Sequence, residues 1–379
     1  MSKIWICLTD DWELRGNGLG TVLDLQCNPC KKLTEVYLRN NVSATFMVEV
    51  MQQLAFEQFS DKYKVIKAER DLWIESVKRM VDMGFDVQLH IHPQWHNAWY
   101  DGKYWHLDKG WNISDYSNDE IDKCVKKSKE YIEGLLCKWD KERKIVAFRG
   151  GSWGGCFPSL HVFSVLEKYG VKVDVTIVDG LYQNGESSKL DYRNIESPFL
   201  PYYPDYEDVR CISADKTEII EIPTQSFIFD GYFFSKLLLN IYRVFIFVNN
   251  KLNILTQNAR EEVIVPHFIV TNPFGNIKGD SINSSTEIFD ICYDRPLIYF
   301  KRAFDIIIKK ALNIQTDKII PLILGNHTKN LTDKQLKRID GLIRYIKKRY
   351  NKYINFVTLK DIVENRDELY IAIKKEMKT

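Results

Sequence analysis

Short apolar segments alternate with longer segments of helical periodicity along this chain. The segment "KIWICLTDD" predicts a first strand, residues 21–40 predict a helix, and "VSATFMVEV" predicts a second strand. Residues 64–83 repeat apolar positions at helical spacing and lead into a third strand, "GFDVQLHIH". A strand–helix alternation of this kind favours a parallel α/β architecture, either closed into a barrel or open.

The second half of the chain continues this alternation. The helix expected from "SNDEIDKCVKKSKEYIEGLLCKW" opens with Ser117 followed by Glu120, a capping box. Later strands are expected in "KIVAFRGGSW", "VKVDVTIVDG", "TEIIEIPT" and "KIIPLILGNH", a helix over residues 158–169, and a last strand and helix in "NFVTLKDIV". We expect a single barrel domain over residues 1–370, with a divergent, insertion-bearing region at 200–300.

Polar side chains stand at the ends of several predicted strands. In the third strand His90 and His92 share one face, because successive strand residues point to opposite sides of the sheet. The first strand ends with Asp10 and Asp11, and their carboxylates could complete a metal site with the two imidazoles. The predicted strand "KIVAFRGGSW" ends with Arg149 and the aromatic Trp153, and "KIIPLILGNH" ends with His327. His327 is the candidate acid that protonates a leaving group. Catalytic groups of α/β barrels gather at this end of the strands.

Composition narrows the function classes. The 379 residues carry a formal net charge of +2, so composition gives no support to a nucleic-acid partner. The N-terminus lacks an apolar run of signal-peptide length, and we expect a cytoplasmic protein.

The C-terminal region is basic: residues 301–379 hold 19 Lys/Arg against 9 Asp/Glu. Such a basic region is usually a solvated helix face and less often contacts an anionic membrane surface. The apolar run at 231–252 is interrupted by charged residues and predicts a packed or interfacial helix rather than a membrane span.

The motifs "LTDD", "GFDVQLHIHP", "AFRGGSWG" and "LGNHTKN" resemble, in this order, those of the polysaccharide deacetylases, carbohydrate esterase family four with the NodB-type fold. The likeness extends from the first strand to about residue 362 and is loose over residues 200–300. The "DDWE" and "LHIHPQW" patterns are most similar to divergent members associated with bacterial surface-polysaccharide genes. The resemblance implies a distorted (β/α)7-type barrel and metal-dependent removal of an acetyl group from a sugar.

The resemblance also implies roles for individual residues. Asp10 would be the general base and Asp11 a metal ligand with His90 and His92, the ion being most simply Zn²⁺. Arg149 would orient the base and His327 would be the acid. The chain departs from the family in two places: Gln94 stands four residues after His90, where a histidine is expected, and glycines replace the proline context after Arg149. Four candidate substrate contacts complete the set: His96, which is also the alternate second histidine ligand, Trp95, Trp153 and Arg15.

Two other functions stay open at this level. One is a glycan-binding protein with the same fold but without catalytic activity. Gln94 favours this alternative, because it stands where the family has a histidine ligand. The other is a hydrolase of non-sugar C–N bonds on the same barrel. The sequence therefore favours a sugar deacetylase acting on an acetylated amino sugar, with these two as alternatives.

Overall fold

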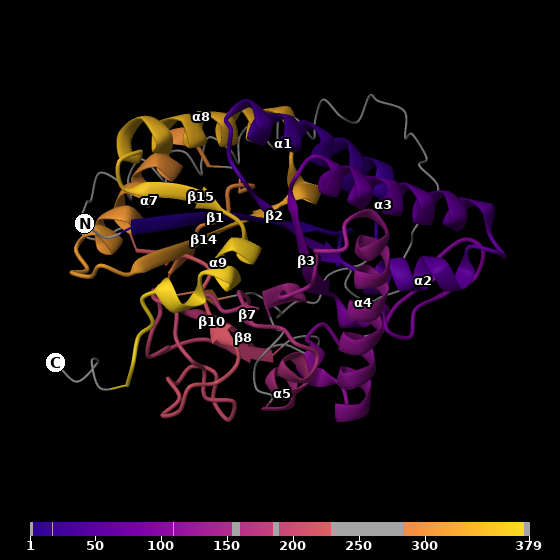
Figure 1. Cartoon of the computed structure of the whole chain (residues 1–379). Coiled ribbons are helices and arrows are strands. Elements are labelled where there is room, and N and C mark those ends of the chain that lie inside the picture. Colours follow the sequence, from indigo (N-terminus) through magenta and orange to yellow (C-terminus); the bar gives the residue numbers. More distant parts are fainter. Residues whose placement is uncertain are drawn as a thin grey trace.

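The computed structural model describes residues 3–16, 18–108, 110–153, 160–184, 189–228, 283–284, 286–293 and 295–374. Its centre is a curled parallel sheet in the strand order β10-β7-β6-β3-β2-β1-β14, with β15 paired to β1 beside β2 (Figure 1). The strands are β1 (Lys3–Trp12), β2 (Thr45–Glu49), β3 (Asp86–Ile91), β6 (Ala147–Gly150), β7 (Val173–Asp174), β10 (Ile220–Glu221), β14 (Ile319–His327) and β15 (Ile354–Val357). A parallel bridge between Thr224 and Ile323 connects the chain after β10 to β14, so the two edges meet. This architecture confirms the predicted distorted (β/α)7-type barrel.

Helices cover the outside of the curled sheet (Figure 1). They are α1 (Asn28–Arg39), α2 (Met51–Phe59), α3 (Lys64–Asp82), α4 (Asn118–Trp139), α5 (Leu160–Lys168), α7 (Leu297–Leu312), α8 (Asp333–Tyr350) and α9 (Leu359–Glu364). The capping box predicted for α4 is confirmed: the Ser117 amide donates to Glu120 Oε2 at 2.9 Å, and the Ser117 side chain accepts from the Glu120 amide. A π-helical stretch, Val22–Cys27, precedes α1 inside the segment predicted as one helix.

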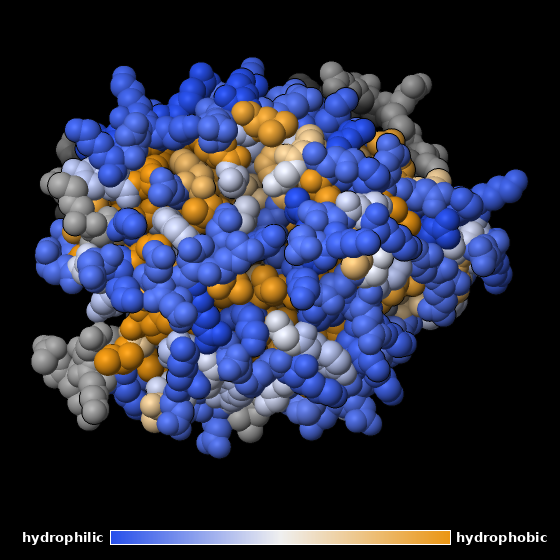
Figure 2. All heavy atoms as spheres, in the orientation of Figure 1, coloured by the Kyte–Doolittle hydropathy of each residue, from blue (hydrophilic) through white to orange (hydrophobic). Residues whose placement is uncertain are grey.

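Smaller sheets decorate the barrel. They are the hairpin β4 (Trp99–Tyr100) and β5 (Trp105–His106), the antiparallel set β12 (Asn283–Ser284), β8 (Leu181–Asn184) and β9 (Lys189–Asp191), and the pair β11 (Ser226–Phe227) and β13 (Glu287–Ile288). The helix expected over 231–252 lies outside the described residues. Among the helices that are described, none combines the length and the hydrophobicity that crossing a membrane requires. The face drawn in Figure 2 is mostly polar, with apolar side chains in small separate groups.

The interior of the barrel differs chemically from the layer between sheet and helices. That outer layer is apolar, as where Trp12 of β1 packs against Trp73 of α3 with ring centroids 5.6 Å apart. The interior instead holds fully buried polar side chains, among them Thr9, Arg149 and Thr224. Buried polar groups need partners, and Arg149 donates to both Thr9 and Thr224 near the carboxyl ends of the strands. Below this polar group the same strand faces carry an apolar cluster that includes Cys7, Met47 and Ala147.

Candidate functional site

The inner face of β1 presents two carboxylates at the end of the strand. Because side chains alternate, Thr9, Asp11 and Glu13 follow one another on the barrel side, Glu13 coming directly after the last strand residue. Asp11 and Glu13 are both almost fully buried. Strand β3 pairs with β2 and carries His90, and His92 follows directly after its last residue. Both histidines lie at the same end of the barrel as the two carboxylates.

Glu13, His90 and His92 converge on one point. Glu13 Oε2 lies 3.5 Å from His90 Nε2 and in direct contact with His92 Nε2, and the three ligand atoms lie within 4.8 Å of one another. All three atoms are buried, and within the described chain none makes a hydrogen bond of regular geometry. Two imidazoles and one carboxylate are a common donor set of catalytic zinc sites, which leave a further position for water or substrate. The residues present therefore fit a divalent ion such as zinc.

The tautomer of His90 suits a metal ligand. Its Nδ1 lies 2.8 Å from the carbonyl oxygen of Arg149. A carbonyl only accepts, so Nδ1 carries the proton and the lone pair of the neutral ring is on Nε2, which faces Glu13. Outer partners of this kind orient metal-binding histidines.

His92 is placed by two residues that depart from the family pattern. Gln94 does not enter the cluster: its side-chain amide lies 3.1 Å from His92 Nδ1 and donates to the carbonyl of Gly16 at 3.0 Å, so it lies between the ring and the β1 loop. A metal at His92 Nε2 requires the proton on Nδ1, where the amide of Gln94 accepts it through its oxygen rather than its NH₂. A Cβ added at Gly151 would lie 2.7 Å from the same ring, closer than real Cβ contacts. Gly151, which directly follows β6, thus makes room for the ring of His92. His92 is therefore the second histidine beside His90, where the family pattern would place one at position 94.

Arg149 binds the carboxylate of Asp11 inside the barrel. Its guanidinium donates to Asp11 Oδ1 at 2.6 Å and to Thr9 Oγ1 at 2.7 Å, and its Nε donates to the carbonyl of Val175 at 3.3 Å. Burial alone would raise the pKa of Asp11, but the charge of Arg149, aided by His90 and His327, lowers it overall. Asp11 is therefore an ionised carboxylate with one oxygen held by arginine and the other facing the cluster.

His327 forms the opposite wall of the site. Its Nδ1–H donates to Asp290 Oδ2 at 2.6 Å, and its Nε2 lies 3.4 Å from Asp11 Oδ2. Burial works against the charged ring, but Asp290 raises the pKa of His327 well above its usual value, so the imidazole is protonated near neutral pH. Trp153 lies beside it with ring centroids 5.9 Å apart, and the Lys329 ammonium pairs with Glu13 Oε1.

Asp10 is not part of this cluster. It is fully buried on the other face of β1, where it accepts hydrogen bonds from Tyr37 of α1, at 2.7 Å, and from the side-chain amide of Asn326. Burial raises its pKa to about 7. The alternation of β1 aims Asp10 at the helix layer and Asp11 at the barrel interior, so Asp10, the expected base, does not face the histidines. Asp11, the expected ligand, belongs to a second candidate ligand group with Glu13 and His327.

Two predicted substrate contacts, Trp95 and His96, lie away from the cluster, and a third, Arg15, is at the surface. Trp95 is 3% exposed and packs between Phe56 and Trp105, so it belongs to the loop core. The Nδ1 of His96 lies 3.2 Å from Cys124 Sγ, away from the cluster, and His92 is the histidine that accompanies His90. Arg15 is exposed on the loop after Glu13.

Two residues of the site were absent from the predicted set, Glu13 and Asp290, whereas Lys329 was expected as a substrate contact beside His327 and instead pairs with Glu13. Glu13 was detectable, since it stands two residues after Asp11 in "DDWE" and therefore on the same strand face. Asp290 follows a segment without strong periodicity, and only the isolated bridge to Gly325 of β14 brings it beneath His327. No local sequence pattern predicts the contact between Asp290 and His327.

A second carboxyl pair lies on the helix-facing side of the sheet, where Glu221 of β10 stands in register with Asp174 of β7, and Asp174 with Phe148 of β6. Both are fully buried, and Asp174 Oδ1 accepts from Thr176 Oγ1 at 2.6 Å. Burial first, and then the charge of Asp174, raise the pKa of Glu221 well above its ordinary value of 4.5. The carboxyl is therefore protonated in the fold.

Replacing Glu221 with glutamine is expected to flatten the pH dependence of stability. Above pH 4.5 the unfolded chain releases a proton that the fold retains, so the free energy of unfolding falls as pH rises, by up to about 1.4 kcal/mol per pH unit until the raised folded pKa is reached. Glutamine has no proton to lose. Urea unfolding between about pH 5 and about pH 8 would measure both slopes, with the exposed Glu207→Gln as control. Equal slopes in all three proteins would contradict a retained proton.

Comparisons with known proteins bear on the fold. No family model and no curated protein sequence matches the chain. A candidate glycoside hydrolase/deacetylase from Parabacteroides distasonis aligns with a TM-score of 0.55 at 14% identity, over 97% of this chain and 72% of that one. Candidate polysaccharide deacetylases from Mycobacterium smegmatis and Pseudomonas aeruginosa PAO1 align at TM-scores of 0.48 and 0.44, with 11% and 12% identity, covering 98% and 97% of this chain and 93% and 92% of theirs. The fold is thus the barrel of the NodB-like deacetylases, and the Parabacteroides distasonis structure is the similarity that carries this conclusion.

Proposed function

We propose that this protein is a metal-dependent hydrolase that removes an acetyl group, most simply an N-acetyl group, from a sugar. The observation that carries the proposal is the meeting of Glu13, His90 and His92 beside two oriented pairs, Asp11 with Arg149 and Asp290 with His327. The structure of the candidate glycoside hydrolase/deacetylase from Parabacteroides distasonis, which has the same fold, supports a carbohydrate substrate. The "DDWE" and "LHIHPQW" patterns further suggest a surface-polysaccharide or glycolipid precursor as substrate, and the N-terminal sequence suggests a cytoplasmic location.

The metal would be held by Glu13, His90 and His92, and zinc suits these donors. When bound, such an ion supplies a positive charge that polarises the acetyl carbonyl and lowers the pKa of a water molecule. Lys329 keeps the other Glu13 oxygen occupied, which leaves Oε2 aimed at the histidines.

The two remaining groups supply base and acid. Asp11, kept ionised by Arg149, accepts the proton as water attacks the acetyl carbonyl carbon. His327, kept protonated by Asp290, donates its Nε2 proton to the nitrogen as the C–N bond breaks. The products are acetate and a free amino sugar. The Nε2 of His327 and the Oδ2 of Asp11 lie 3.4 Å apart, so both groups can reach one amide bond.

The test is acetate release by the purified protein with its metal content measured in parallel. A panel of N-acetylated and O-acetylated sugars, free and nucleotide-linked, should contain at least one substrate, and a matched panel of non-sugar amides should give no turnover. Loss of activity on chelation, and recovery with zinc or another divalent ion, is expected. Protein that carries no metal after incubation with divalent ions, and that binds sugars without releasing acetate, would support the non-catalytic glycan-binding alternative instead.

A further inference from the structure

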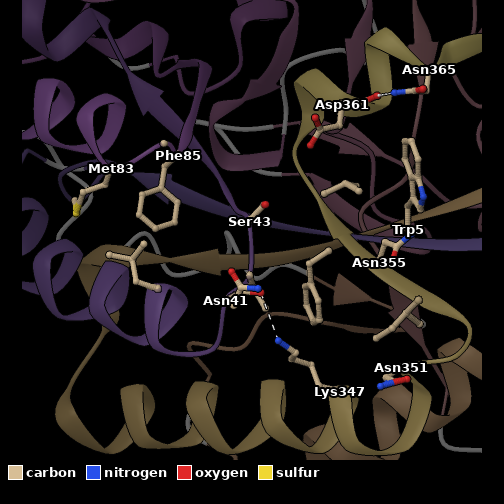
Figure 3. Close-up of a pocket in the computed structure, with 16 residues that line it drawn as sticks. Trp5, Asn41, Ser43, Met83, Phe85, Lys347, Asn351, Asn355, Asp361 and Asn365 are labelled. Carbon is tan, nitrogen blue, oxygen red and sulfur yellow. Dashed lines mark hydrogen bonds between the residues drawn. The ribbon is translucent and has the colours of Figure 1, made fainter.

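A groove of about 780 Å³ opens at the opposite end of the barrel from the metal cluster. It is bordered by the loop between α1 and β2, the loop before β3, the end of α8, and by β15 and α9 (Figure 3). Trp5 of β1 lines it, six residues before Asp11 on the same strand. At about 3.3 Å per residue the two sites are roughly 20 Å apart. The groove is therefore a separate feature and not an extension of the candidate active site.

The lining combines aromatic rings with side-chain amides. Trp5 and Phe356 are each partly exposed, whereas Phe85 is buried at one wall. The exposed polar side chains of the lining are Asn41, Ser43, Asn351 and Asn355. An amide both donates and accepts hydrogen bonds, as does a hydroxyl, so these groups match a ligand rich in hydroxyls. A purely hydrocarbon ligand would leave them without partners, at a free-energy cost.

The charged residues of the lining are already engaged. The Lys347 ammonium donates to the backbone carbonyls of Asn40 and Asn41, as Figure 3 shows for Asn41. The Asp361 carboxylate accepts from the backbone and the hydroxyl of Thr358, at 2.7 Å and 2.8 Å, where it caps α9. Phosphate and carboxylate ligands are held by arginine and lysine clusters, and this lining offers one lysine that is already bonded. The ligand that fits is therefore uncharged.

We propose that this groove binds a neutral saccharide, independently of the chemistry at the metal cluster. Aromatic rings pack against the apolar faces of sugar rings, and the amides bond the hydroxyls around them. The volume falls within the range of pockets that enclose compact small molecules, the size class of a di- or trisaccharide. Such a site holds the protein on a glycan chain at a point about 20 Å from the reacting residue.

The proposal is tested by calorimetric titration of the full chain with neutral trisaccharides of glucose, galactose and N-acetylglucosamine, and with phosphorylated glucose. At least one neutral trisaccharide is expected to bind, with a Kd between about 1 μM and about 1 mM. The double variant Asn351→Ala/Asn355→Ala should weaken that binding at least about tenfold. The control Asn313→Ala changes an exposed asparagine outside the lining and should leave the Kd within about twofold.

Two further variants keep the outcome decisive. Ser43→Tyr fills the groove from an exposed position and should abolish binding even if the double variant folds poorly. Asp11→Asn should leave the affinity unchanged, which separates this site from the candidate active site and from the fate of the proposed function. Absence of binding by all neutral trisaccharides at millimolar concentration would overturn the proposal. Preference for the phosphorylated sugar, or binding unaffected by the groove variants, would overturn it equally.

Discussion

Replacing Asp11 with asparagine is expected to lower turnover about 10²- to 10⁴-fold and to leave the metal content unchanged. Asparagine keeps the shape of the side chain and its contact with Arg149, but it cannot take a proton from water. The three proposed ligands, Glu13, His90 and His92, are all retained. Elemental analysis of the purified variant and acetate release under single-turnover conditions would measure the two quantities separately.

The matched control is Asp10→Asn, one residue earlier. Its carboxylate faces Tyr37 and Asn326 in the helix layer, so turnover is expected to stay within a few-fold of the parent protein. One of the two donors loses its acceptor, which lowers the free energy of unfolding by about 1–3 kcal/mol. The "LTDD" resemblance alone gives the reverse assignment, with Asp10 as base. If Asp10→Asn lost turnover at unchanged stability while Asp11→Asn stayed active, Asp10 would be the base and our assignment of Asp11 would be wrong.

Replacing Glu13 with glutamine is expected to remove the metal. The amide is a poor ligand for zinc and places its NH₂ or its neutral oxygen where Oε2 contacts both histidines. We expect the metal affinity to fall by more than the 10–100-fold that is typical when an outer partner of a ligand is changed. Competition with a chelating dye measures this affinity without reference to turnover.

Lys329→Met supplies the comparison, because it removes the cation that holds Glu13 Oε1 and leaves all three ligands in place. Its loss of metal affinity should be within about 10–100-fold and smaller than that of Glu13→Gln. If Glu13→Gln bound metal as tightly as the parent protein, the ion would lie in the group of Asp290, Cys292 and His327, which does not include Glu13, and our ligand assignment would be wrong.

The strands and most helices of the barrel followed from local pattern, because buried parallel strands are short apolar runs and covering helices carry an apolar stripe. The bounds moved by a few residues: the strand predicted to start at Gly84 starts at Asp86. The helices α2, α7 and α8 were not predicted, although α7 and α8 each have an apolar face. The region at 231–252 lies outside the described residues and its helix stays a prediction.

The site was predicted in part, and the errors have a physical cause. His90 and His92 converge as the alternation along β3 predicts, and their role as ligands stays a prediction. The same alternation in β1 separates Asp10 from Asp11 and places Glu13 with Asp11, but the adjacent aspartates were treated as a unit. Asp290 could not be found, since its partnership with His327 depends on how a loop returns to β14.

The close approach of His92 to Gly151 ties two distant positions of the chain together. An added Cβ would collide with the imidazole, so a side chain at position 151 displaces the ring that the cluster needs. In other barrels of this architecture, an acid two residues after the interior aspartate, a His-x-His strand end and a glycine two residues after the arginine should occur as a set. That combination is a search pattern for chains that hold their ion in this way, and a sequence with the histidines but a bulky residue at the glycine position is expected to bind no metal there.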